Sequence, residues 1–133
     1  MKALPCFIAA LSLLGGCIHS QPEFFSADGL SAQFPLQATA LAEEAAVKLA
    51  AKYPAGNTIL YVAPAQENRH FARVLEHTLR LRGFAVSSDP EVSDIRISYQ
   101  TDSMPTDKGR LGYCRIKSSD GEIFSLVKPL GTQ

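Results

Sequence analysis

The residues best suited to chemistry in this 133-residue chain are three histidines and three cysteines, and their spacing does not form a catalytic or metal site. His70 and His77 share one side of a predicted helix but lie two turns apart, whereas metal-binding pairs on helices are three or four residues apart. His19 lies far from both in the sequence. The chain has no glycine-rich phosphate loop and no Gly-x-Ser-x-Gly motif. We therefore predict that the protein is not an enzyme and that it uses no metal and no cofactor.

The first sixteen residues have the pattern of a secretory signal peptide. Lys2 makes the start basic, an apolar run extends from Leu4 to Leu14, and Gly15-Gly16 provide the small residues of a cleavage site. The run is shorter than the roughly 20 apolar residues that span a bilayer. A buried core helix is the alternative, and the two glycines argue against it. We predict a signal peptide over residues 1–16.

Cys17 follows this leader directly. The sequence Leu14-Gly15-Gly16-Cys17 resembles the lipobox of bacterial lipoproteins. The resemblance implies that Cys17 becomes the first residue of the mature chain and carries acyl chains on its sulfur and its amine. Several chains anchor a protein where a single one does not, at about 0.8 kcal/mol per buried methylene. Ile18 stands where an inner-membrane lipoprotein has Asp, which implies the outer membrane, with the protein facing the periplasm.

Cysteine usage rules out an intramolecular disulfide in such a mature chain. Cys6 leaves with the leader and Cys17 is lipidated, so Cys114 is the remaining thiol. A lone thiol in an oxidising compartment is either buried or available for an intermolecular bridge. We expect it to be buried.

Residues 17–37 read as a lipidated N-terminal tether, because they contain two prolines and a glycine and show no periodicity. The tether nevertheless carries Phe24, Phe25 and Phe34, which a plain linker does not need. These rings indicate a docking segment that binds a partner protein. The alternative is that they pack on the domain or lie at the lipid interface.

Residues 38–133 have the pattern of a small α+β domain. Apolar residues recur at helical spacing over Thr39–Tyr53, with Thr39 as the expected N-cap, and over Asn68–Arg82, which Gly83 ends. We predict a two-layer sandwich in which two helices pack on a mostly antiparallel sheet of four to five strands. The expected strands cover residues 58–63, 84–86, 95–100, 111–117 and 122–128, with a loop over 101–110. Asp120-Gly121 marks a closing hairpin, which leaves a sheet edge open to a partner strand.

Charge gives little indication of a polyanionic partner, since 13 basic and 13 acidic residues balance. We expect no direct contact with nucleic acid. The second predicted helix has a basic outer face, formed by Arg69, Arg73, Arg80 and Arg82 and interrupted by Glu76. Such a face can meet an acidic partner or phospholipid head groups, but it is more often simply solvated.

The whole chain resembles the TrbH family of conjugal-transfer lipoproteins. The resemblance joins Gly15-Gly16-Cys17, the alanine-rich segment 40–46, Tyr53-Pro54, the Leu-Arg-x-Arg-Gly-Phe-Ala-Val run of residues 79–86, and Leu111-Gly112-Tyr113. It implies a type IV secretion, or conjugation, apparatus with a ring-shaped core complex in the outer membrane. There this protein is expected to anchor and stabilise the core beside TrbG-like and TrbI-like subunits, without catalysis. The alternative is a periplasmic lipoprotein that regulates or chaperones cell-envelope assembly.

Overall fold

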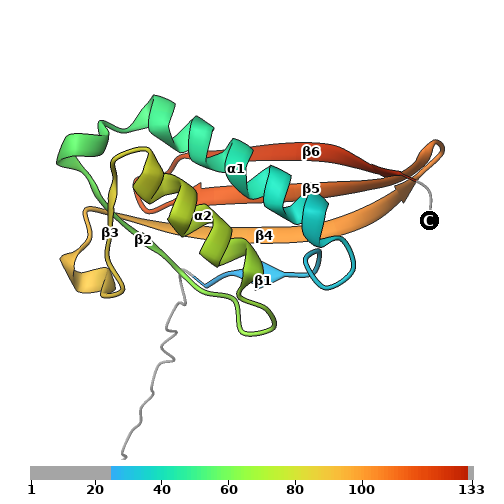
Figure 1. Cartoon of the computed structure of the whole chain (residues 1–133), viewed down its shortest axis with the longest axis horizontal. Helices are drawn as coiled ribbons and strands as arrows, with labels where there is room; N and C mark the ends of the chain where they lie inside the picture. The colour runs from blue at the N-terminus through green and yellow to red at the C-terminus, as the bar shows by residue number, and fades with distance from the viewer. Residues whose placement is uncertain (1–24, 132–133) are drawn as a thin grey trace, which may run out of the picture.

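Two α-helices cover one face of a six-stranded sheet in the computed structural model, which describes residues 25–131 (Figure 1). The predicted signal peptide, Cys17 and Phe24 lie outside the described residues. Short 3-10 helices occupy Ala55–Asn57 and Pro90–Val92. The longer elements are, in chain order, β1 (Ala27–Asp28), α1 (Pro35–Lys52), β2 (Ile59–Val62), α2 (His70–Leu81), β3 (Ala85–Val86), β4 (Ile95–Thr106), β5 (Gly109–Ser118) and β6 (Ile123–Gly131).

The sheet is mixed, which corrects the expectation of a mostly antiparallel sheet of four to five strands. Its order is β3-β2-β4-β5-β6. The long strands β4, β5 and β6 pair antiparallel, whereas β2 pairs in parallel with β3 and with β4. Parallel neighbours arise because α2 carries the chain back across the sheet between β2 and β3. The α+β class is confirmed.

Strand β1 is the sixth strand, and it shares one side of β4 with β2. The first part of β4 pairs with β2 through Ile95–Ile97, and further along Gln100 and Thr101 pair in parallel with Ala27 and Asp28. The N-terminal end of the domain therefore lies beside the central strand β4.

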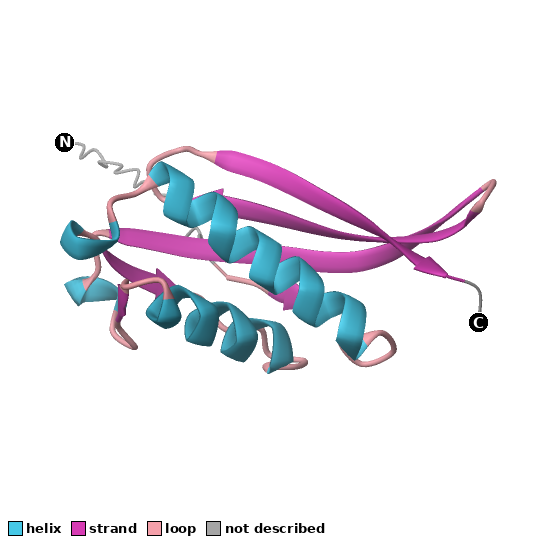
Figure 2. Ribbon diagram, turned by 45° about the horizontal axis from the view of Figure 1, so that its top comes forward, coloured by secondary structure: helices cyan, strands magenta, loops and turns pink. Residues whose placement is uncertain are grey.

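The core lies between the helices and one face of the sheet (Figure 2). Helix α1 turns a face rich in alanine inward, which lets it approach α2 and the sheet closely. Helix α2 buries Phe71, Leu75 and Leu79, and the Phe71 ring lies 4.6 Å from the Tyr99 ring of β4, centroid to centroid. Aromatic rings at this separation attract each other beyond the area that they bury.

Helix α1 begins at Pro35, four residues before the expected N-cap at Thr39. Proline suits the first turn of a helix because its missing N–H would have no helical partner there. Thr39 lies inside the helix instead, and its Oγ1 is 2.8 Å from Nε2 of His70. This hydrogen bond joins the second turn of α1 to the first residue of α2.

The segment 101–110, expected to be a loop, is the end of a long β4–β5 hairpin. Thr106 pairs with Gly109, so a two-residue turn connects the strands. The second hairpin follows the prediction: Ser118 and Glu122 flank its turn, and Gly121 has a φ of +99°, which glycine adopts at little cost.

Candidate functional site

The histidines and the free thiol do not form a reactive site within residues 25–131. No group of three His, Cys, Asp or Glu side chains is placed there to hold a metal ion. His77 is exposed, while His70 is half-buried against Thr39. Cys114 is fully buried on β5, and burial together with the negative charges of Asp28 and Glu44 raises the pKa of its thiol to about 12. A thiol in this state is a poor nucleophile and a poor partner for a disulfide.

No helix in the described part of the chain is both long enough and apolar enough to cross a bilayer.

The place where the chain enters the domain is built from buried polar groups, which we call the N-terminal seat: Ser26, Asp28, Ser31 and Thr101. Ser26 Oγ donates to the carbonyl oxygen of Ala63 at 2.6 Å and accepts from the Tyr99 amide at 3.0 Å. It thus joins the segment after β2 to β4 across the entering chain. Its side chain is 9% exposed, so these bonds are shielded from water.

Asp28 is the centre of the N-terminal seat. Its Oδ1 accepts hydrogen bonds from the amides of Leu30 and Ser31 and from Thr101 Oγ1, at 3.0, 2.9 and 2.8 Å, and its Oδ2 accepts from Ser31 Oγ at 2.6 Å. Burial alone would raise the pKa of this carboxyl, but the hydrogen bonds from Ser31, Thr101 and Leu30 together lower it below its usual 3.8. The buried carboxylate is therefore stabilised in its charged form by the fold around it.

Residues 26–37, which the sequence placed in the tether, form part of the folded domain. Leu30 is fully buried and Phe34 is 6% exposed within the core, so Phe34 packs on the domain and does not present its ring to a partner. Phe25 is 65% exposed at the point where the chain leaves the domain. Of the three rings predicted to bind a partner, Phe25 is thus on the surface, Phe34 is internal, and Phe24 lies outside the described residues.

The two phenylalanines give a matched pair of variants. We expect Phe34→Ala to lower the free energy of unfolding by about 3 kcal/mol, because it empties a buried site, and Phe25→Ala to change it by less than about 0.5 kcal/mol. Thermal and urea unfolding of the purified chain would measure both values. A large loss of stability in Phe25→Ala would show that this ring belongs to the core.

The face of the sheet opposite the helices is covered by no other described element, and we call it the open face. It carries the basic residues Arg96, Arg115 and Lys117, and the carboxylate of Asp102 lies further along β4, opposite Tyr113. Towards the β4–β5 turn the open face becomes apolar, since Met104 pairs with Leu111, and Tyr113 lies between Asp102 and Val127. Val127 is 60% exposed.

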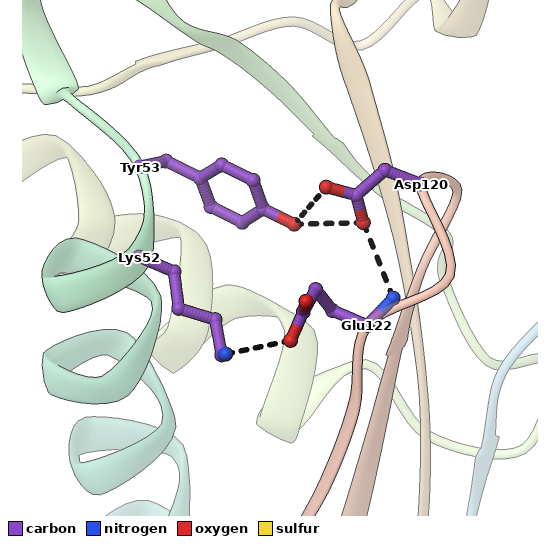
Figure 3. Close-up of polar contacts among 4 residues, drawn as sticks. All are labelled: Lys52, Tyr53, Asp120 and Glu122. Carbon is purple, nitrogen blue, oxygen red and sulfur yellow. Dashed lines mark hydrogen bonds and ion pairs between the residues drawn. The ribbon is translucent and has the colours of Figure 1, made fainter.

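A polar junction joins the end of α1 to the β5–β6 turn (Figure 3). Lys52 Nζ donates to Glu122 Oε1 at 2.6 Å, and the Tyr53 hydroxyl lies 2.9 and 2.8 Å from the two carboxylate oxygens of Asp120. Partial burial and the negative charge of Asp120 raise the pKa of Tyr53, so its hydroxyl remains a donor at neutral pH. The junction fixes the hairpin turn against the helix, and it brings no nucleophile beside a base.

The basic outer face of α2 is exposed, as expected. Arg80 lies 3.9 Å from Glu76 one turn earlier and donates to the Val86 carbonyl oxygen at 3.2 Å. An exposed pair of this kind contributes less than about 1 kcal/mol. The arrangement is that of a solvated helix face.

Sequence reasoning missed the N-terminal seat. A signal was present, because Asp28 is followed three residues later by Ser31, and an Asp side chain that bonds amides two and three residues ahead is a common turn. The bond from Thr101 could not be anticipated, since 73 residues separate the two side chains.

Comparison with known proteins gives one family. The model of a family described as conjugal transfer protein TrbH matches residues 20–122 of this chain. The match includes the N-terminal seat, both helices, β4 and β5, and it ends where β6 is about to begin. No curated protein and no solved structure matches the chain.

Proposed function

The chain belongs to the TrbH family of conjugal transfer proteins, and we propose that it is a structural component that is held to the outer membrane by acyl chains on Cys17. In this proposal the protein faces the periplasm and belongs to the core complex of a type IV secretion system. TrbG-like and TrbI-like subunits are its proposed neighbours in a ring-shaped assembly.

The N-terminal seat is the observation that best supports an anchoring role. Only the residues between Cys17 and Phe25 separate the proposed lipid site from the folded domain, a stretch of at most about 30 Å when fully extended. The chain then enters beside the central strand, held by the buried bonds of Ser26 and Asp28. A membrane anchor at Cys17 would therefore be coupled closely to a rigid module.

Confinement near the membrane gives such a module a simple physical role. A subunit held at a surface meets its neighbours at a high effective concentration, so weak contacts can stabilise an assembly. The exposed Phe25 and the open face offer such contacts on the described surface. This role requires binding and no chemistry.

The proposal is tested by an in-frame deletion of the gene with complementation by the wild-type chain. We expect DNA transfer to fall by about 100-fold or more, since multivalent anchoring multiplies weak affinities by factors of that order. Affinity purification of the complementing chain from solubilised membranes should recover core subunits. Normal transfer in the deletion strain would contradict the proposal and would favour a role in cell-envelope assembly.

A further inference from the structure

Strand β6 is an edge of the sheet, and its first part lacks the usual protection against strand pairing, whereas Lys128, Pro129 and a register shift protect its end. It is the last strand in the sheet order, and Figure 1 shows α1 crossing its helix side diagonally. The stretch Ile123–Val127 contains no charged residue and no proline, and Ile123 and Val127 are 49% and 60% exposed. Natural edge strands normally carry charges, prolines or bulges that prevent strand pairing, because an open apolar edge pairs with other chains.

The hairpin fixes which backbone groups of β6 are open. Ser118 donates its amide to the Glu122 carbonyl, and the register continues with Ile116 beside Phe124 and Cys114 beside Leu126. In an antiparallel ladder the hydrogen-bonded residues alternate, so the even-numbered residues of β6 bond to β5. Ile123, Ser125 and Val127 consequently direct their N–H and C=O groups away from the sheet. Pro129, which has no N–H, continues this outward series.

These features are self-complementary, and we propose that two copies of this chain pair antiparallel through β6, with a two-fold axis at Ser125. Outward backbone groups meet when the axis passes through any residue of Ile123–Val127, because an antiparallel two-fold axis can lie at a hydrogen-bonded pair or at a non-hydrogen-bonded pair. An axis at Ser125 places Ile123 opposite the second copy's Val127, and Phe124 opposite its Leu126. Each apolar side chain then meets an apolar side chain on its own face of the sheet.

The same register also matches charge. It places Glu122 opposite the second copy's Lys128, and the two-fold symmetry produces a second, equivalent pair. Both side chains lie on the helix side, where Glu122 contacts Lys52 at 2.6 Å and Lys128 contacts Glu44 at 3.4 Å. A carboxylate has two oxygens and an ammonium has three donors, so each group can bind across the axis and keep its present partner. An axis at Ile123, Phe124, Leu126 or Val127 does not place Glu122 opposite Lys128, so the charge match selects Ser125.

Pairing of this kind joins two sheets into one continuous sheet and closes the assembly at two copies along this edge. It also covers a nine-residue edge strand, whereas the opposite edge, β3, has only two residues. The inference uses residues beyond the TrbH match and does not depend on the lipid anchor.

Disulfide trapping tests this register in the full-length chain. In Ser125→Cys the two new thiols would lie on residues whose Cα atoms are about 5.5 Å apart, a separation that disulfides accept. We expect a mild oxidant to produce a covalent dimer. Arg115→Cys is the matched control, because Arg115 is exposed directly beside Ser125 but one strand inward. It should give at least about tenfold less dimer, since its Cα atoms in the two copies would be too far apart.

Ser125→Pro supplies a second measurement. The Ser125 amide points outward, so proline removes a donor at the edge and leaves the β5–β6 ladder intact. Analytical ultracentrifugation should show dimers for the wild-type chain and monomers for Ser125→Pro, at equal melting temperatures. A folded Ser125→Cys protein that forms no disulfide would overturn the proposal. A covalent product with a different polypeptide, identified by mass spectrometry, would also overturn it and assign this edge to a strand of another subunit.

Discussion

Replacement of Cys17 by alanine is expected to leave the protein unprocessed and without acyl chains, and to reduce DNA transfer as strongly as deletion does. The reason is that the thiol is the proposed acceptor of the first lipid group, and alanine cannot replace it. Loss of the acyl chains removes a membrane affinity of about 0.8 kcal/mol for each buried methylene. Fatty-acid labelling and mass spectrometry of the N-terminal peptide would report the modification, and mating assays would report transfer.

Two further variants separate the parts of this prediction. Cys114→Ala changes the buried thiol and should leave acylation intact. Ile18→Asp should retain the acyl chains but move the protein to the inner membrane, which membrane fractionation would detect. A free thiol at position 17 in protein from native cells, or an intact leader, would contradict the anchoring role.

Replacement of Asp28 by asparagine is expected to cause the largest loss of stability among polar substitutions in the described domain. Four donors converge on this carboxylate, and an asparagine amide cannot accept all of them. Hydrogen bonds to a buried charge contribute about 1.5–3 kcal/mol each, and they are not additive. We expect the free energy of unfolding to fall by about 3 kcal/mol, or roughly 10–20 °C in melting temperature. Asp107→Asn, in the exposed β4–β5 turn, is the control and should change little.

The same substitution should alter the pH dependence of stability. Folding lowers the pKa of Asp28 below its usual 3.8, so the folded state holds this proton less readily than the unfolded chain. The stabilisation is therefore complete above that usual value and is lost as the pH falls through the folded pKa. Urea unfolding between pH 7 and pH 2 should show this acid loss in the wild-type chain. The loss should be smaller in Asp28→Asn, and an identical pH profile would contradict the assignment.

The sequence pattern predicted the helices and turns that depend on neighbouring residues. Helix α2 follows from the spacing of Phe71, Leu75 and Leu79, and it ends before Gly83, whose φ of +96° requires a residue without a side chain. The β5–β6 hairpin follows from Asp120-Gly121. Membership of the TrbH family was also visible in the sequence and is confirmed by the family match.

The parts that were missed depend on contacts between distant residues. Strand β1 has only two residues and no periodicity. Its extended conformation depends on pairing with β4 and on the hydrogen bond from Thr101 to Asp28. Pro105 and Gly109 resemble loop residues, but both lie at the end of the hairpin, where a strand tolerates them. Pro35 did signal the start of α1, and the choice of Thr39 overlooked it.

The position of β1 has a mechanical consequence. Tension on the N-terminus reaches a strand that lies alongside the longest strand of the sheet, in the same direction. A pull along that direction loads the hydrogen bonds of Ser26, Gly29 and Asp28 in shear, so that they resist together instead of peeling apart one by one. With the proposed acyl anchor at Cys17, thermal movement of the bilayer would therefore pull on the whole domain and would not unfold its first residues.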